Sequence, residues 1–197
     1  LIGYCLGGTM AIATANVAPV ERIATIASPW RFSGYPADSR RSLGELWRGA
    51  KSAAASFNLL AMEVLQGAFW SLDPRRTVEK FARFSRLDPA SDEVRRFVVL
   101  EDWANEGEPL PHAAARELIE DFFGNDLPGS GEWKVSGRPM SDRLSVPLLH
   151  FTSTKDRITP DASAAHGARG EIAAGHVGMG VGSARRQLHR GLDRFFG

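Results

Sequence analysis

Short apolar runs typical of buried strands lie near the start of the chain and again in its last quarter. Between them, apolar residues recur every three or four positions. The apolar runs lie at residues 1–4, 22–27 and 146–152 and are rich in branched side chains. A helix of small residues, 9–16, separates the first two runs, which predicts a right-handed strand–helix–strand unit. We therefore expect an α/β protein whose parallel sheet is built from both ends of the chain.

Between these ends, from residue 36 to residue 140, the periodicity is helical. Apolar positions continue through residues 57–69, in a helix expected to end at Asp73-Pro74, and then through 81–98. A further helix is predicted from Pro111 to a C-cap at Gly124. The pattern predicts a core made of residues 1–35 and 141–197, and a large helical cap insertion made of residues 36–140. Four tryptophans fall in this insertion: Trp47, Trp70, Trp103 and Trp133.

The last part of the chain predicts a short helix at 162–168, a strand at 170–174 and a glycine-rich loop at 175–180. Residues 183–196 then form an amphipathic helix. We expect Leu188, Leu192, Phe195 and Phe196 to face inward, and the arginines of this helix to face solvent.

Composition narrows the class of protein. The 24 basic and 23 acidic residues give a net charge of +1, which does not indicate a nucleic-acid partner. A single cysteine excludes an internal disulfide and fits a reducing compartment. Residues 1–18 carry no charge, but they include polar residues and lack a basic n-region, so we expect neither a signal peptide nor a transmembrane segment. Because the chain has no initiator methionine and starts inside a strand that we expect to be central in the sheet, we expect it to be the C-terminal part of a longer protein.

The most unusual local pattern lies at residues 3–8, which have the sequence GYCLGG. A strand that ends in Gly-x-nucleophile-x-Gly and continues into a small-residue helix has the layout of an α/β-hydrolase nucleophile elbow, here with cysteine as the nucleophile. The layout predicts a strained turn at Cys5, and a Cβ at Gly3 or Gly7 is expected to collide where strand and helix pass closely. The first helical turn, with the Leu6 N–H, would favour a thiolate and later an oxyanion. The alternative is a buried structural cysteine.

Cys5, Asp156 and His176 follow the order nucleophile, acid, histidine that α/β-hydrolases use. Each lies in a loop directly after a predicted strand, where the sites of α/β sheets gather. A thiol that transfers acyl groups needs a base to take its proton and a group to orient that base. These three residues are therefore the predicted catalytic set.

Other residues of the same types are weaker candidates. Asp161 is expected to cap the helix that follows it, His150 to be packed in its strand, and His166 and His189 to be solvated helical residues. His112 lies in the insertion near a helix start, where a surface position is favoured over an approach to the substrate. The arginines of the insertion are better explained as a solvated face than as a phosphate site; they include Arg40, Arg41, Arg75, Arg76, Arg95 and Arg96.

A cysteine nucleophile favours transfer from a thioester. Exchange of an acyl group between two thiols is nearly thermoneutral, so an acyl-Cys5 formed from a coenzyme A thioester keeps the activation of the donor for a later hydroxyl acceptor. This argument favours transfer over ester hydrolysis without excluding hydrolysis.

Residues 3–8 resemble the box around the catalytic cysteine of polyhydroxyalkanoate (PHA) synthases, and equally that of dienelactone hydrolases. The roughly one hundred residues between Cys5 and Asp156 that form the insertion favour the synthases, because dienelactone hydrolases have no cap between the two. Further stretches are similar to the synthase pattern: residues 26–32, 102–112, 131–139, 156–160 and 175–177.

The resemblance implies an α/β-hydrolase fold and polymerisation of 3-hydroxyacyl-CoA with release of coenzyme A. Cys5 would hold the acyl chain, His176 would act as general base, and Asp156 would orient His176 or activate an incoming hydroxyl. The implied partners are 3-hydroxyacyl-CoA and the growing polyester chain, with coenzyme A entering as substrate and no separate cofactor or metal. A cytoplasmic location at the surface of polymer granules follows, and a homodimer is compatible with it.

Two other functions remain open on the sequence. A Cys-dependent thioesterase or polyester depolymerase would use the same three residues but admit water. A non-catalytic granule-associated partner would keep the fold without the chemistry, although an intact Cys5, Asp156 and His176 argue against it.

Overall fold

A parallel sheet of four strands forms the centre of the computed structural model, which describes residues 1–71 and 74–197. The strand order is β1-β2-β7-β8, with β1 at Ile2–Tyr4, β2 at Ile23–Ile26, β7 at Leu148–Thr152 and β8 at Ala168–Glu171. Every neighbouring pair in this sheet is parallel. The predicted α/β class and parallel sheet are confirmed, and both ends of the chain contribute strands.

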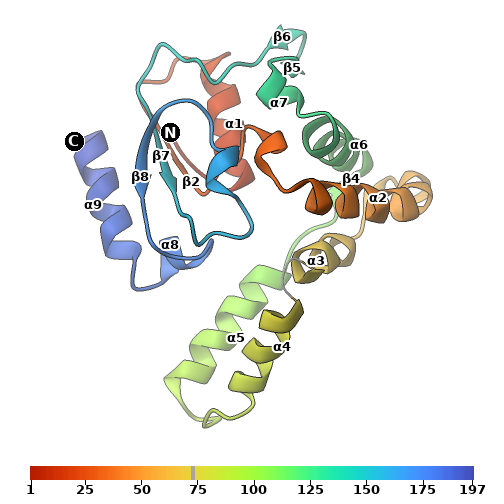
Figure 1. Ribbon diagram of the computed structural model, residues 1–197, viewed down its shortest axis with the longest axis vertical. Helices are drawn as coiled ribbons and strands as arrows, with labels where there is room; N and C mark the ends of the chain where they lie inside the picture. Colours follow the sequence, from red (N-terminus) through yellow and green to blue (C-terminus); the bar gives the residue numbers. More distant parts are fainter. Residues whose placement is uncertain (72–73) are drawn as a thin grey trace. The chain divides into compact units, whose positions relative to one another are not determined.

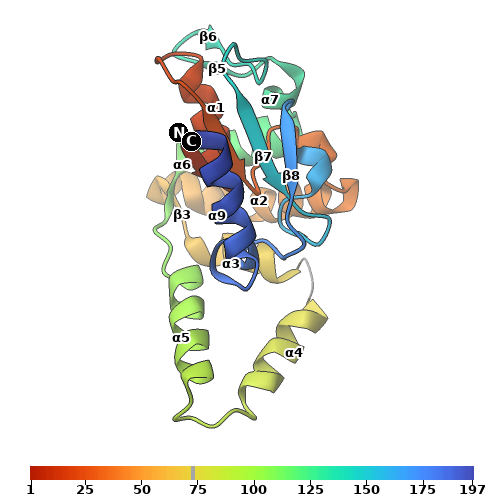
Figure 2. The ribbon, with the colours of Figure 1, turned by 90° about the vertical axis from the view of Figure 1, so that its left-hand side faces the viewer.

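Helices cover both faces of this sheet (Figures 1 and 2). Helix α1 (Leu6–Ala15) follows β1 directly, while α8 (Gly178–Val181) and α9 (Arg185–Phe196) lie on the other face. Strand β1 is at the edge of the sheet and not at its centre, and Ile2 is 56% exposed.

The apolar face of α9 packs against the sheet as its periodicity predicts. Leu188 is buried together with Phe151 and Met179, and Phe195 is partly buried against the same cluster. Phe196 was expected to face inward as well, but it is exposed. Consecutive helical residues are rotated by about 100°, so Phe196 cannot share the inward direction of Phe195.

The connection between β7 and β8 differs from the prediction. Residues 162–168 do not form a helix: a 3-10 turn, η3 (Asp161–Ser163), is followed by β8, which begins at Ala168 and not at residue 170. The Ser163 carbonyl accepts hydrogen bonds from the N–H groups of Trp30 (2.7 Å) and Arg31 (2.8 Å). A helix would need that carbonyl for its own ladder, so this long-range contact stops the helix after one turn.

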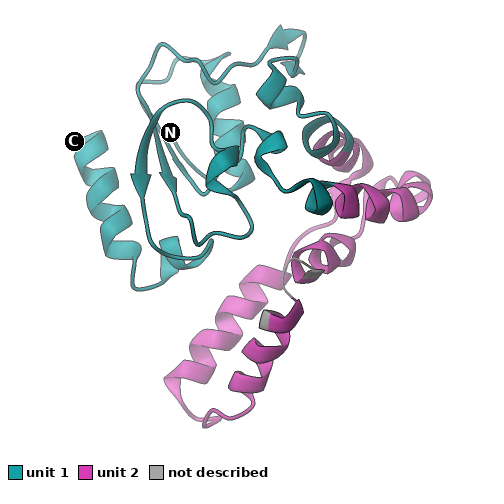
Figure 3. Ribbon diagram, in the orientation of Figure 1, with its two compact units in different colours: residues 1–40, 120–197 teal, residues 41–119 magenta. Residues whose placement is uncertain are grey.

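The chain separates into two compact units (Figure 3). Unit 1 consists of residues 1–40 and 120–197 and contains the sheet, and unit 2 consists of residues 41–119. Unit 2 is shorter than the predicted insertion of residues 36–140. One reason is that Trp133 packs within unit 1, with its ring centroid 5.8 Å from that of Trp30 and 4.9 Å from that of Phe122. Unit 1 also contains α7 (Leu127–Ser130) and a small hairpin of β5 (Lys134–Val135) and β6 (Arg138–Pro139).

Unit 2 is mainly helical, and the long α2 (Ala37–Phe57) leads into it. The helix predicted through residues 57–69 is interrupted, because Asn58 takes a left-handed conformation (φ 55°) and β3 (Leu59–Leu60) pairs with β4 (Leu110–Pro111). Helix α3 (Met62–Ser71) follows; its predicted end at Asp73 lies outside the described residues. The helix expected after Pro111 is present as α6 (His112–Arg116) and a π-helical segment, η2 (Glu117–Gly124).

The rest of unit 2 is a pair of helices, α4 (Pro74–Phe84) and α5 (Asp92–Asn105). Phe97 packs on Phe84 with ring centroids 4.2 Å apart, and Lys80 Nζ lies 2.7 Å from the Glu101 carboxylate. Not every tryptophan of the insertion is packed inside it: Trp47 is buried, whereas Trp70 and Trp103 are exposed.

Candidate active site

A strained turn at Cys5 joins β1 to α1. Cys5 has φ 51° and ψ −130°, a sparsely populated conformation that costs a non-glycine residue about 1–3 kcal/mol. The turn is held on both sides, because the Cys5 N–H donates to the Ile26 carbonyl (2.9 Å) and the Gly8 N–H donates to the Cys5 carbonyl (3.0 Å). The surrounding backbone thus fixes the residue that the sequence singles out as nucleophile.

Two glycines allow strand and helix to pass at this turn. A Cβ on Gly3 would lie 2.4 Å from the Gly8 Cα, and a Cβ on Gly8 would lie 2.0 Å from the Ser28 Oγ. The expectation for Gly7 is wrong: a Cβ there would meet nothing within 4 Å. Gly7 is exposed in the first turn of α1, whereas Gly8 is buried against Ser28 and Thr25.

This difference gives a matched pair of variants. Gly3→Ala is expected to lower the free energy of unfolding by several kcal/mol, because the added methyl meets backbone that cannot move without breaking the turn. Gly7→Ala should leave it unchanged or raise it by up to about 1 kcal/mol, because alanine is the better helix former. Urea titration of both variants measures the difference, and equal losses in the two would contradict this account of the turn.

Asp156 lies in the loop after β7, and both oxygens of its carboxylate accept hydrogen bonds. Oδ1 accepts hydrogen bonds from the N–H groups of Ile158 (2.8 Å) and Thr159 (3.0 Å), and Oδ2 accepts one from His176 Nδ1 (2.8 Å). The carboxylate is buried, with a side-chain exposure of 0%. The two backbone donors hold the carboxylate in an orientation that aims Oδ2 at His176. The sequence did not reveal these donors, since any residue type can supply an N–H.

His176 follows β8 and meets both other members of the predicted set. Burial alone would lower its pKa, but hydrogen bonds to Asp156 and to the Cys5 side chain, together with their charges, raise the pKa of His176 to about 9. Because Nδ1 is bonded to Asp156, Nε2 is the ring nitrogen that is left for the Cys5 side chain. Cys5, Asp156 and His176, from three separate loops, therefore lie in one cluster.

The raised pKa of His176 has a consequence for stability. The folded protein holds the imidazole proton more tightly than the unfolded chain does. This proton therefore stabilises the fold fully below about pH 6.5, and the contribution is lost as the pH rises through about 9. We expect the free energy of unfolding to fall by up to about 3 kcal/mol over that range, and His176→Gln to remove the fall. Urea titrations at pH 6.5 and 9.5 measure it.

The matched control is His189→Gln, on the exposed side of α9. Its free energy of unfolding should fall with pH as that of the wild type does. A His176→Gln protein that loses stability with pH as the wild type does would contradict the assignment.

Leu6 is the first residue of α1 and follows Cys5 directly. The first N–H groups of an α-helix have no intrahelical acceptor, so the Leu6 N–H is available beside the sulfur for a developing negative charge. Its role as an oxyanion donor stays a prediction.

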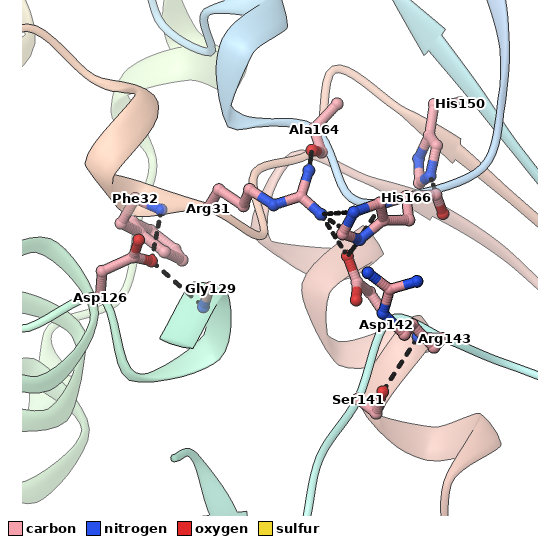
Figure 4. A network of polar contacts seen from close by, with 10 residues as sticks. All are labelled: Arg31, Phe32, Asp126, Gly129, Ser141, Asp142, Arg143, His150, Ala164 and His166. Carbon is pink, nitrogen blue, oxygen red and sulfur yellow. Dashed lines mark hydrogen bonds and ion pairs between the residues drawn. The ribbon is translucent and has the colours of Figure 1, made fainter. Parts of the chain in front are cut away.

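His150 and His166 lie away from this cluster, in a second polar network (Figure 4). His150 is buried in β7, as expected, with Nδ1 2.6 Å from the Thr25 hydroxyl, and burial lowers its pKa. His166 is not helical: it lies in the loop before β8, where its N–H donates to the Asp142 carboxylate (2.8 Å). Arg31 donates to the same carboxylate (3.1 Å) and lies against the His166 ring. The His166 carbonyl also lies 3.3 Å from His150 Nε2 on β7, so the network connects the loop to the sheet.

The remaining candidates have local roles. Asp161 does not cap a helix with its side chain; its carboxylate pairs with Arg169 at 2.7 Å. His189 is exposed as expected. His112 is less exposed than predicted, because its ring stacks on Trp47 and its Nε2 is buried.

The arginines predicted to form a solvated face differ from one another. Arg40 does not fit the prediction, because it is only partly exposed and its guanidinium donates to the Phe123 carbonyl (3.4 Å). Arg75 pairs with Glu79 and Arg95 with Asp92, each on its own helix and highly exposed. The side chain of Arg76 lies outside the described residues.

Within residues 1–71 and 74–197, no group of three or more histidine, cysteine, aspartate or glutamate side chains is placed to hold a metal ion. In the same residues, no helix combines the length and the apolarity needed to cross a membrane.

Comparison with known proteins gives two distant relatives. No protein-family model matches the chain. The chain is 26% identical, over 196 aligned residues, to the poly(3-hydroxyalkanoate) polymerase subunit PhaC of Haloferax mediterranei, with 93% of the chain and 40% of that protein covered. It is 22% identical to the PhaC of Haloarcula marismortui, with 93% and 42% covered. The chain thus spans about two fifths of the length of these relatives.

Among solved structures, an esterase from Exiguobacterium antarcticum superposes on the whole chain with a TM-score of 0.54 at 14% identity, and 66% of that chain is covered. At this identity the likeness concerns the fold alone. The parallel sheet, the strand–turn–helix at Cys5 and this superposition identify the α/β-hydrolase fold.

Proposed function

Because the chain is a distant homologue of polyhydroxyalkanoate polymerase subunits, we propose that it carries the catalytic centre of an acyltransferase that polymerises 3-hydroxyacyl-CoA. The observation that carries this proposal is the 2.8 Å hydrogen bond between His176 Nδ1 and the buried Asp156 carboxylate, beside a cysteine in a positive-φ turn. A structural cysteine would need neither the strained turn nor a histidine held at its sulfur.

In the first proposed step, the Cys5 Sγ attacks the thioester carbonyl carbon of 3-hydroxyacyl-CoA. The thiol proton passes to His176, and Asp156 stabilises the resulting imidazolium. The oxygen of the tetrahedral intermediate takes the negative charge, which the Leu6 N–H is placed to bind. The bond to the coenzyme A sulfur then breaks, the leaving thiolate takes the proton from His176, and the acyl group stays on Cys5.

In the second step, the hydroxyl of another 3-hydroxyacyl unit attacks the acyl-Cys5 carbonyl. His176 takes the hydroxyl proton, an ester bond forms, and the Cys5 sulfur leaves and is reprotonated. Each cycle converts one thioester into one ester and releases one coenzyme A. A thioester at Cys5 keeps the activation of the donor between the two steps, which a serine ester would partly lose.

The proposed partners follow from this chemistry. 3-Hydroxyacyl-CoA and the growing polyester are the substrates. Because the product is insoluble, the enzyme is proposed to act at the surface of a polymer granule in the cytoplasm. Unit 2 is proposed to act as the cap, and a second copy of the chain is a compatible partner.

Product analysis tests the proposal. The intact protein is incubated with 3-hydroxybutyryl-CoA, coenzyme A release is followed with a thiol reagent, and the products are separated by size. Polyester with released coenzyme A in proportion to its ester bonds is the expected result. Free 3-hydroxybutyrate as the sole product would instead identify a thioesterase, and no release at all would fit a non-catalytic partner.

A further inference from the structure

His176 is bonded to Asp156 through Nδ1, and the Cys5 side chain is its other hydrogen-bond partner. A further contact acts on the face of the imidazole: the ring of Tyr4 lies against it, with centroids 5.0 Å apart and the planes inclined by 43°. Tyr4 is the last residue of β1 and directly precedes Cys5. The end of β1 and the turn that follows it therefore carry both a ring that contacts His176 and the sulfur that His176 serves as base.

We propose that Tyr4 is a positioning residue, whose aromatic ring holds the His176 imidazole in line with the Cys5 sulfur. The ring is itself supported, because it packs on the core cluster that contains Ile26, Met179 and Leu188. The inference rests on the proposed function of Cys5 and His176, and it extends that function to a residue that takes no part in bond making.

The hydroxyl of Tyr4 does not explain the contact. It is buried and has no hydrogen-bond partner among the described residues. Burial, followed by the charges of Cys5 and Asp156, raises the pKa of Tyr4, so the phenol stays protonated and does not exchange protons with His176 at working pH. The ring is thus the part of Tyr4 that acts on His176, and phenylalanine should replace it.

Three variants separate positioning from packing. Tyr4→Leu removes the ring that touches His176, and Tyr4→Phe keeps it. Phe195→Leu makes the same ring-to-leucine change against the same core cluster, on α9. All three are compared with the wild type by urea titration and by the rate of Cys5 alkylation with iodoacetamide between pH 5 and 10. The intact protein is also assayed for kcat and KM with 3-hydroxybutyryl-CoA.

For Tyr4→Leu we expect kcat to fall by about 10- to 100-fold with little change in KM, and alkylation of Cys5 at neutral pH to become slower, because a displaced imidazole takes up the thiol proton less well. Tyr4→Phe and Phe195→Leu should keep the wild-type alkylation profile, although Phe195→Leu loses stability.

Two results would overturn the inference. One is a Tyr4→Leu protein whose alkylation profile matches that of Phe195→Leu, which would make the ring ordinary core packing. The other is a loss in Tyr4→Phe as large as that in Tyr4→Leu, which would assign the role to the hydroxyl. Alkylation needs no acyl-CoA, so a protein that failed as a polymerase would still report the effect of Tyr4 on the Cys5–His176 pair.

Discussion

Cys5→Ala is expected to abolish coenzyme A release from 3-hydroxybutyryl-CoA, with a loss of roughly 10⁴-fold or more. Every bond change in the proposed cycle passes through the Cys5 sulfur, and the chain contains no second cysteine to replace it. The fold should survive the change, because the side chain makes no backbone hydrogen bond that holds the turn; those bonds come from the Cys5 N–H and carbonyl. Coenzyme A release measures the loss, and urea titration measures the fold.

The control for this variant is Cys5→Ser, which keeps a nucleophile of similar size in the same turn. Serine is a weaker nucleophile than a thiolate, so slow release with some hydrolysis is expected. A Cys5→Ala protein that is folded and releases coenzyme A at the wild-type rate would refute the role of Cys5.

His176→Ala should lower the rate of coenzyme A release by about 10²–10⁴-fold, because the thiol then lacks the base that takes its proton and the acid that returns it to the leaving group. The variant also frees Asp156 Oδ2, whose partner is the His176 Nδ1 at 2.8 Å. Asp156→Asn should lose less, since the imidazole remains near the sulfur but is less well oriented and its pKa falls.

The pH profile provides the internal check on His176. At neutral pH, alkylation of Cys5 should be faster in the wild type than in His176→Ala, because the imidazole of His176 takes up the thiol proton. The matched variant is His150→Ala, which removes a buried histidine bonded to Thr25 and should cost stability without moving the profile. Equal profiles in wild type and His176→Ala would contradict the account.

The sequence pattern predicted those site residues that directly follow an apolar run. Cys5, Asp156 and His176 each follow a strand, so the topology of a parallel sheet was enough to expect them at one edge. The turn at Cys5 was predictable because glycines flank it, although the sequence could not say that Gly8 and not Gly7 is the tight one. That distinction depends on Ser28, which is distant in the sequence.

The features that the sequence missed depend on contacts between distant segments. The helix expected at 162–168 stops because the Ser163 carbonyl is taken by Trp30 and Arg31, and the helix expected through 57–69 is interrupted because Leu59 pairs with Pro111. The backbone donors to Asp156 leave no compositional signal. Tyr4 looked like an ordinary strand residue until its ring was seen against His176.

The central claim is that an acyl group rests on the Cys5 sulfur between two transfers, and peptide mapping tests it most directly. The intact protein is mixed with 3-hydroxybutyryl-CoA, quenched in acid within the first turnover, digested, and analysed by mass spectrometry. The account predicts a 3-hydroxybutyryl group on the peptide that contains Cys5, removed by hydroxylamine and absent in Cys5→Ala. An acyl group found on another residue, or coenzyme A released while Cys5 stays unmodified throughout the turnover, would contradict it.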